Sequence, residues 1–387
     1  MSTYKLISWG ANSHGQLGQG VSSEQCLLPQ EIDLSECGLK PESARKIVGG
    51  GGHTLILDTE GRVYSCGRND KGQTGISDSE LTNILTFRRL PLDNKTIVDV
   101  CCGWDSSAAL TNDGDLYLWG SNRYGQLGDD PSTHSSTSLP IRTIRSGKVR
   151  RVSMGLRHTA AVTDNGNVLV CGANSKGQLG LTNAENKQSR DARHCFTAIP
   201  GLMDVEDVAC GEHHTVVARL HGGVYATYFF GDNKHGQAGL DPREYMRICS
   251  AHHSVYCDLR LGAPIHIHAG WSHTNILNDG VVYSWGRNSY GQLGRGKLEE
   301  TGCGFWKMQR VENLPRIVQL SVGSEHNVAL AEGGAIFCWG WNEHGNCGNG
   351  NTKDVLLPEP LSLPHDFIGV LVGSGAGHSF AVIKNIT

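Results

Sequence analysis

The sequence predicts an all-β protein, a closed ring of seven β-sheet blades called a β-propeller, and three observations support this prediction. A phrase built around Trp-Gly, or its equivalents Cys-Gly and Phe-Gly, recurs seven times at spacings of 57, 53, 52, 59, 55 and 54 residues. A second phrase, Gly-x-x-His, keeps the same period, and the two ends of the chain read as halves of one repeat. A near-constant period of this size is typical of propellers, in which each unit buries its apolar face against its neighbours.

The first phrase continues into a glycine-rich tail, as in the Gly-Gln-Leu-Gly that ends at Gly18. The glycines that anchor its seven copies are Gly10, Gly67, Gly120, Gly172, Gly231, Gly286 and Gly340. Between the two phrases lie turn-forming pairs such as Asp113-Gly114 and Asn165-Gly166, which favour tight hairpins. Short runs rich in β-forming residues flank them, and no long amphipathic helix is apparent. Each repeat is therefore expected to be an antiparallel sheet.

The second phrase places one histidine in six of the seven repeats, and Ser106 takes that place in the remaining one. The histidines are His53, His158, His214, His273, His326 and His378. A ring does not need six catalytic bases, so we interpret these histidines as structural side chains that bond a neighbouring turn. The other histidine clusters lack paired metal-ligand spacing, so no metal site is predicted.

The ends of the chain complement each other. The last Gly-x-x-His copy, at 375–378, is followed by one apolar run to Ile383 and no further turn. The missing strand stands at the other end, where residues 4–10 read as the strand that carries the first Trp-Gly copy. We therefore expect the N-terminal strand to complete the last blade, which removes two exposed sheet edges.

Composition limits the function classes. The unbroken repeat predicts a single domain over residues 1–387, although the length alone would allow two or three. A net charge of −4 without a basic tail argues against nucleic acid, and no run reaches membrane-spanning length. Thirteen cysteines, mostly inside repeat strands, favour a reducing compartment, so we expect a cytoplasmic protein, with nuclear presence left open. No phosphate loop, nucleophile elbow or dinucleotide fingerprint is found; no cofactor is predicted, and enzymatic activity is left open.

The two residues inside each Gly-x-x-His phrase are the candidate binding residues, because a propeller places equivalent positions of every blade at one end of the ring. The repeat fixes the flanking glycine and histidine but not this pair. Aromatic residues and arginine are favoured at protein interfaces, and here they occur beside acids. The alternative is a solvated ring of loops with scattered polar residues. The candidates for a partner-binding rim are Trp104, Asp105, Arg157, Glu212, His213, Trp271, Ser324 and Glu325.

Three stretches lengthen the repeat after the glycine-rich tail, at residues 181–200, 240–261 and 295–315. Long loops on a rigid scaffold often carry function, and surface decoration is the equally weighted alternative. The sequence does not decide between these two interpretations.

These phrases resemble the repeat of the regulator of chromosome condensation family, and the resemblance extends from Tyr4 to Ile383. Within that family the chain is similar to the branch of secretion-regulating guanine nucleotide exchange factors. The strings that carry the resemblance include Gly-Gly-Gly-Gly-His at 49–53, Cys-Gly-Trp-Asp at 102–105, Gly-Trp-Ser-His at 270–273 and Trp-Gly-Trp-Asn-Glu-His-Gly at 339–345. The resemblance implies a seven-bladed propeller that binds a small GTPase and promotes nucleotide exchange on it.

By position, Asp105, His213 and Glu325 match the residues that the family's founder uses on its exchange face, and Glu212 and Arg157 are their neighbours. The resemblance also implies links to the exocyst and to secretion. The competing hypothesis is a non-catalytic adaptor that docks proteins in trafficking. A third branch of the family, the plant ultraviolet receptors, clusters tryptophans on adjacent blades. Here Trp104 and Trp271 lie three repeats apart, which argues against a stacked chromophore.

Overall fold

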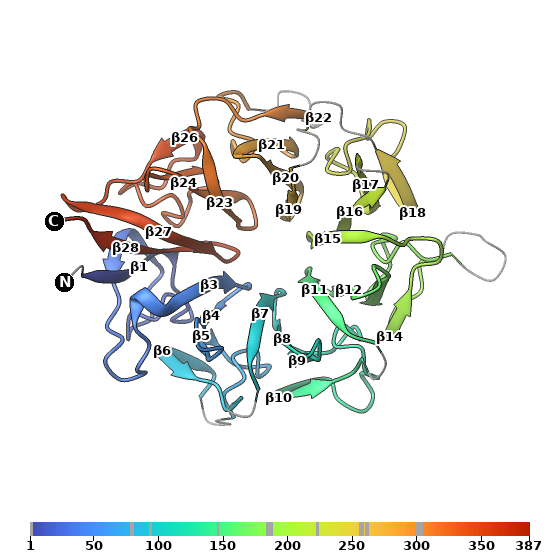
Figure 1. Ribbon diagram of the computed structural model, residues 1–387, viewed down its shortest axis with the longest axis horizontal. Helices are drawn as coiled ribbons and strands as arrows, with labels where there is room; N and C mark the ends of the chain where they lie inside the picture. Colours follow the sequence, from blue (N-terminus) through green and yellow to red (C-terminus); the bar gives the residue numbers. More distant parts are fainter. Residues whose placement is uncertain are drawn as a thin grey trace.

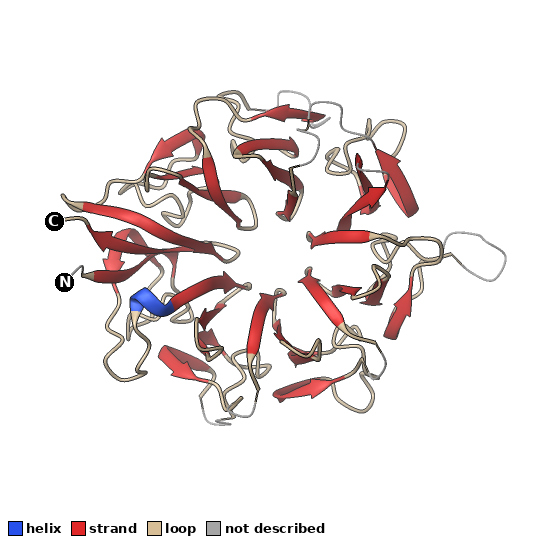
Figure 2. Cartoon of the chain, viewed as in Figure 1, coloured by secondary structure: helices blue, strands red, loops and turns tan. Residues whose placement is uncertain are grey.

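The structure is a computed structural model that describes residues 3–77, 81–92, 95–144, 147–182, 189–221, 224–254, 259, 263–298 and 305–387. In these residues the chain forms 28 strands and one short helical turn, η1 (Pro41–Ser43). Figure 1 shows the strands grouped into sheets that radiate from a central axis, with both termini at the same point of the ring. Coloured by secondary structure, the ring is made of strands throughout (Figure 2). The predicted all-β propeller is confirmed.

Each blade is an antiparallel sheet of four strands, and its first strand lies beside the central channel. We number the blades from the one that begins with β3. The innermost strands are β3 (Ala44–Gly49), β7 (Ile97–Cys102), β11 (Val149–Met154), β15 (Val205–Cys210), β19 (Ile265–Ala269), β23 (Ile317–Val322) and β27 (Phe367–Ser374). The second strands are β4 (His53–Asp58), β8 (Ser106–Thr111), β12 (His158–Thr163), β16 (His214–His221), β20 (His273–Asn278), β24 (His326–Ala331) and β28 (His378–Asn385).

The third strand of each blade carries the Trp-Gly phrase, and the fourth lies at the circumference. The third strands are β5 (Val63–Arg68), β9 (Leu116–Ser121), β13 (Val168–Gly172), β17 (Val224–Asp232), β21 (Val281–Gly286), β25 (Ile336–Gly340) and, for blade 7, β1 (Tyr4–Ala11). The fourth strands are β6 (Asn83–Arg89), β10 (Ser136–Arg142), β14 (Arg193–Ala198), β18 (Arg247–Ser254), β22 (Phe305–Arg310), β26 (Val355–Pro360) and β2 (Gln25–Glu31).

The ring closes in blade 7, where the two ends of the chain share one sheet. Strand β1 pairs antiparallel with β28 from Tyr4 opposite Lys384 to Gly10 opposite His378. This confirms the expected closure, and the structure extends it, because β2 also pairs with β1 and completes the blade. The N-terminal segment therefore supplies two strands of the last blade rather than one. A single parallel pair, Ser374 with Val48, also joins blades 7 and 1 at the channel.

The tryptophans of the first phrase bind one blade to the next. Trp9, Trp119, Trp285 and Trp339 are completely buried. Each indole Nε1 donates to a backbone carbonyl in the glycine-rich turn of the preceding blade, at 2.8 to 3.1 Å. In blades 1 and 3 a buried cysteine replaces tryptophan, and its thiol reaches the same kind of carbonyl. The repeating phrase is thus a contact between blades, which explains why it recurs once in each.

The anchoring glycine is required by both backbone conformation and space. Gly67 has φ +100°, and a Cβ built there would lie 2.4 Å from the carbonyl oxygen of Gly52. All seven anchoring glycines have φ between +97° and +112°. Any other residue would push away the Gly-x-x-His loop that lies against it.

The three stretches that lengthen the repeat contain regular structure. The described part of 181–200 holds β14, the described part of 240–261 holds β18, and the described part of 295–315 holds β22. These stretches thus supply the fourth strands of blades 3, 4 and 5. Residues 183–188, 255–258, 260–262 and 299–304 lie outside the described residues.

Candidate functional site

The seven Gly-x-x-His phrases form tight loops at one end of the channel, and we call them the rim loops. They comprise residues 50–53, 103–106, 155–158, 211–214, 270–273, 323–326 and 375–378. In each loop the glycine N–H donates to the carbonyl of the residue in the histidine position, at 2.8 or 2.9 Å. The carbonyl just before that position accepts the N–H that follows the next anchoring glycine, at 2.7 to 2.9 Å. All seven loops are therefore held in the same conformation, and their variable residues lie at one end of the ring.

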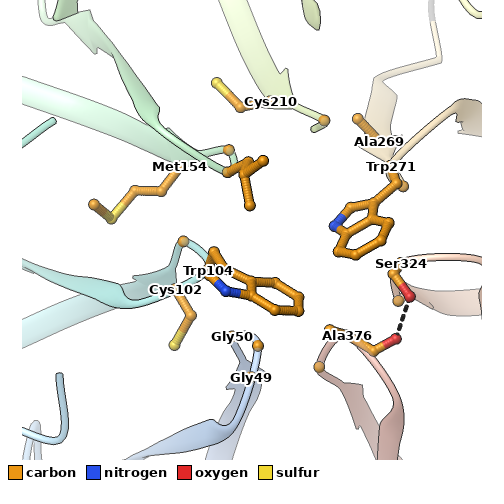
Figure 3. A pocket seen from close by; sticks show the side chains of 18 of the residues that line it. Gly49, Gly50, Cys102, Trp104, Met154, Cys210, Ala269, Trp271, Ser324 and Ala376 are labelled. Atoms are coloured by element: carbon orange, nitrogen blue, oxygen red, sulfur yellow. Dashed lines mark hydrogen bonds between the residues drawn. The ribbon is translucent and has the colours of Figure 1, made fainter. Parts of the chain in front are cut away.

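In six of the seven rim loops the first variable residue lines the mouth of the channel. Trp104, Leu156, Trp271, Ser324 and Ala376 line a small cavity of about 100 Å³ there. The indoles of Trp104 and Trp271 meet across the axis, with ring centroids 5.2 Å apart and planes tilted by 48° (Figure 3). Separation by three repeats in the chain thus does not keep these two tryptophans apart. Both indoles thus lie at the mouth of the channel.

The second variable residue lies farther out, against the glycine-rich turns. Glu325 is only 4% exposed, and its carboxylate accepts from Gln292 Nε2 at 2.5 Å and from Arg287 Nη1 at 3.2 Å. His273 Nδ1 also lies 3.6 Å from it. This carboxylate is therefore part of the structure of blades 5 and 6, and little of it is available to a partner.

Ser324 is also buried, and it serves the ring. Its hydroxyl donates to the carbonyl of Ala376 in the next rim loop, a bond drawn in Figure 3. The side chain is 5% exposed. Of the eight predicted rim residues, Ser324 and Glu325 are the two that the structure places in the interior.

The remaining rim residues are at least partly exposed. Burial raises the pKa of Asp105, and the nearby Arg68 opposes this shift. Burial likewise raises the pKa of Glu212, with Glu325 adding to the shift. Arg157 is exposed, and its guanidinium lies 4.4 Å from the ring centre of Tyr124. The rim therefore presents two carboxyls that burial makes easier to protonate, beside an arginine held on an aromatic ring.

His213 lies beside Glu212, with 3.5 Å between Nε2 and Oε1. Burial lowers the pKa of His213, and the carboxylate of Asp232 opposes the shift. Its Nδ1 has no hydrogen-bond partner among the described residues. This nitrogen is buried, so the part of His213 that faces a partner is its ring edge beside Glu212.

The six repeat histidines bond side chains in the second strand of the next blade, rather than a neighbouring turn. His378 Nε2 lies 2.9 Å from the hydroxyl of Thr54, and that hydroxyl donates its only proton to the carbonyl of Gln16 at 2.8 Å. The histidine must therefore donate from Nε2, which fixes the neutral Nε2–H tautomer. The same arrangement joins His53 to Ser107, His158 to Thr215, His214 to Thr274 and His326 to Ser379, while His273 meets the side-chain oxygen of Asn327.

Burial keeps five of these rings neutral. It lowers the pKa to about 3 for His53, His158, His214, His326 and His378. Each of them ties the second strand of its blade to the next blade. The repeat histidines therefore join neighbouring blades and do not act as acids or bases.

The sequence interpretation missed rim residues that come from the first phrase. Arg287 lies 4.8 Å from the ring centre of Tyr290, and Tyr290 lies 6.5 Å from Trp341, which in turn contacts His344 at 5.3 Å. Arg287 and Trp341 directly follow an anchoring glycine, and Tyr290 and His344 stand three residues further on. These two positions vary between repeats in the same way as the rim pair, and that variation is the signal that could have found them.

Behind the tryptophan pair the channel widens to a cavity of about 710 Å³. Lys46 and Asp99 form an ion pair of 2.5 Å across blades 1 and 2 there. Burial would lower the pKa of Lys46, but the Asp99 carboxylate outweighs it and raises that pKa. Within the described residues no three His, Cys, Asp or Glu side chains are arranged to hold a metal ion, and no helix could cross a membrane.

The comparisons with known proteins agree with this geometry. The model of the RCC1-like domain matches residues 5–381. The chain belongs to the RCC1-like domain family. It is 32% and 34% identical to the secretion-regulating guanine nucleotide exchange factors of Bos taurus and Mus musculus, over 98% of this chain and 83% of each relative.

Members of this family that carry different names match this chain at similar levels. It is 31% identical to the ultraviolet-B receptor UVR8 of Arabidopsis thaliana, over 92% of this chain and 78% of that receptor. Among solved structures, Prp20p of Saccharomyces cerevisiae superposes with a TM-score of 0.85 at 24% identity, covering 100% of this chain and 92% of that one. The structural likeness establishes the fold of the RCC1-like domain, and the function must be argued from the site.

Proposed function

We propose that this RCC1-like protein is a guanine nucleotide exchange factor, or a regulator, of a small GTPase in the cytoplasm. Two relatives bear the name of such an exchange factor, and Prp20p, the yeast protein of the same fold, binds Gsp1p. The observation that carries the proposal is the arrangement of the rim. Trp104, Trp271 and Arg157 lie with the carboxyls of Asp105 and Glu212 at one end of the ring.

An exchange factor needs no nucleophile. It binds the GTPase more tightly without nucleotide than with it, and by linkage this weakens nucleotide binding by the same factor. Aromatic and arginine side chains on a rigid rim supply the contact energy, and carboxyls beside them can compete for cations at the phosphate site. Secretory components, including the exocyst, are the partners that we propose alongside the GTPase.

The experiment measures release of labelled GDP from a panel of purified small GTPases. We expect the protein to accelerate release from one member at least tenfold and to bind that member more tightly when nucleotide is removed. The Asp105→Ala variant should lose most of the acceleration. Unchanged release from every member, together with equal binding of the nucleotide-free and GTP-loaded forms, would exclude exchange.

A second function, that of a non-catalytic adaptor, is favoured by one observation. Glu325 and Ser324 are occupied within the ring, so two of the eight predicted rim residues are not free to act on a GTPase. An adaptor would bind its partner regardless of the nucleotide state and would leave GDP release unchanged. The GDP-release experiment separates the two functions.

A further inference from the structure

Two kinds of hydrogen bond tie neighbouring blades together beside the rim, and we call each interface between neighbouring blades a seam. The first tie runs from a repeat histidine to the second strand of the next blade. The second runs between the backbones of adjacent rim loops, as in Trp271 N to Ser324 O at 2.8 Å. Within the described residues, the seams 1–2, 4–5, 5–6, 6–7 and 7–1 have both ties, and the seam 3–4 has the histidine tie alone.

The seam between blades 2 and 3 has neither tie in the part of the chain that the structure describes. Ser106 stands in the histidine position of blade 2, and Thr159 in blade 3 receives no imidazole. The backbone bond between their rim loops is also missing among the described residues. Among the described residues, the seam with the fewest of these two kinds of hydrogen bond is therefore the one beside Ser106, where the sequence departs from the repeat.

A surface groove on the rim face lies over blade 2 and borders this seam. Its lining runs from Asp70 and Lys71 of blade 1, across blade 2, to Leu156 and Arg157 in the rim loop of blade 3. It encloses about 530 Å³, within the range of roughly 300 to 1,000 Å³ that is usual for binding pockets. The lining includes Trp104, which also lines the mouth of the channel, and the stacked pair of Tyr124 and Arg157. The hydroxyl residues Ser121, Ser135 and Ser136 complete the lining together with the charged residues Asp70, Lys71, Asp105 and Arg123 and with Leu156.

The lining carries three cationic side chains, Lys71, Arg123 and Arg157, against the two carboxyls of Asp70 and Asp105, and this balance favours an anionic occupant. Asp70 is already neutralised, because Arg68 lies 2.7 Å and Lys71 3.3 Å from its carboxylate. Arg123 and Arg157 are exposed, and no carboxylate among the described residues forms an ion pair with either. An arginine held on an aromatic ring is already oriented to bind a carboxylate with two parallel hydrogen bonds.

We propose that the groove over blade 2 binds an acidic segment of the partner protein, with its carboxylates on Arg123 and Arg157 and an apolar part against Trp104. This inference rests on the proposed function in one respect: the partner that supplies the acidic segment is the small GTPase of that proposal. On the side of blade 3 the groove borders the seam that lacks both ties, so Arg157 can adjust there without breaking either kind of hydrogen bond between blades.

The first test uses two fluorescent octapeptides, in which serine alternates with either glutamate or lysine. Fluorescence anisotropy should show that the glutamate peptide binds, that added salt weakens binding, and that the lysine peptide does not bind. The double variant R123E/R157E should weaken binding at least tenfold. The matched control R45E/R151E reverses two exposed arginines at the other end of the channel and should change affinity less than threefold.

The second test locates the site by hydrogen exchange, where the glutamate peptide should protect residues 104–106 and 121–126. Equal affinity of parent and R123E/R157E, or protection elsewhere, would overturn the assignment. The same variants are then tested for GDP release. If the peptide binds as described while no GTPase responds, the exchange function fails and the groove stands. If release is accelerated and R123E/R157E does not reduce it, the groove assignment fails and the exchange function stands.

Discussion

Because the repeat histidines are buried as neutral rings, we expect the free energy of unfolding to fall as the pH is lowered, until the protein unfolds in mild acid. Burial lowers the pKa to about 3 for five of the repeat histidines. In the unfolded chain each has a pKa of about 6.5. Between these values the unfolded state binds more protons than the folded state, so the free energy of unfolding falls as the pH falls.

The magnitude follows from the same shift. Each histidine contributes a slope of about 1.4 kcal/mol per pH unit below pH 6, and lowering the pH from 7 to 5 removes about 2 kcal/mol for each ring. For five rings the loss is about 10 kcal/mol, which is comparable to the whole stability of a typical domain, about 5 to 15 kcal/mol. We therefore expect the ring to unfold near pH 5.

The assay is urea unfolding followed by circular dichroism at half-unit steps from pH 7.5 to 5. The variant His326→Gln keeps a donor toward Ser379 but cannot titrate, so its slope should be shallower by about 1.4 kcal/mol per pH unit. The control His365→Gln changes a ring that is 94% exposed and should keep the parent slope. A free energy of unfolding that is the same at pH 7 and pH 5 would refute the reasoning, as would a parent slope in His326→Gln.

Three further predictions concern the ring and its rim. The variant Ser106→His should add the missing tie to Thr159 and raise the free energy of unfolding by about 1 kcal/mol, measured by urea unfolding at pH 7; a lower value would contradict the assigned role of the histidine. Glu325→Ala should lower the free energy of unfolding by about 3 kcal/mol, seen as a lower thermal midpoint, because Arg287 and Gln292 lose the carboxylate that accepts their hydrogen bonds. Asp105→Ala should lower the free energy of unfolding by less than about 1 kcal/mol. Removal of residues 1–11 deletes β1 from the middle of blade 7 and should abolish cooperative unfolding in calorimetry; a sharp transition in the truncated chain would show that the ring closes without it.

The fold could be predicted because its repeating residues have local physical reasons that show in the sequence. Positive φ requires glycine at positions such as Gly67, and the indole of Trp119 needs a carbonyl in the preceding turn, so both recur with the period of the blade. The fourth strands were not predicted. Strand β2, for example, has no fully buried residue, and without a buried face it lacks the apolar pattern that marks a strand. The same cause made β14 and its counterparts in blades 4 and 5 look like insertions.

The site could be predicted only in part, because the sequence shows which residues vary but not what they touch. The repeat placed Asp105 and Glu325 in equivalent positions, and the structure holds their loops alike. Burial of Glu325 depends on Arg287 and Gln292, which come from a different phrase of the preceding repeat. The contact between Trp104 and its partner Trp271 depends on the width of the ring, which no local pattern records.

Blade 2 shows that the repeat histidine is not needed for the conformation of the rim loop, only for the hydrogen bond to the next blade. Its rim loop has Ser106 in place of histidine, yet Gly103 N still donates to Ser106 O at 2.8 Å, and Ser121 N to Asp105 O at 2.8 Å. The loop conformation is thus independent of the imidazole, and the contribution of the histidine lies in the tie to the next blade. Losing it at one seam therefore loosens the ring there without altering how Trp104 and Asp105 are presented.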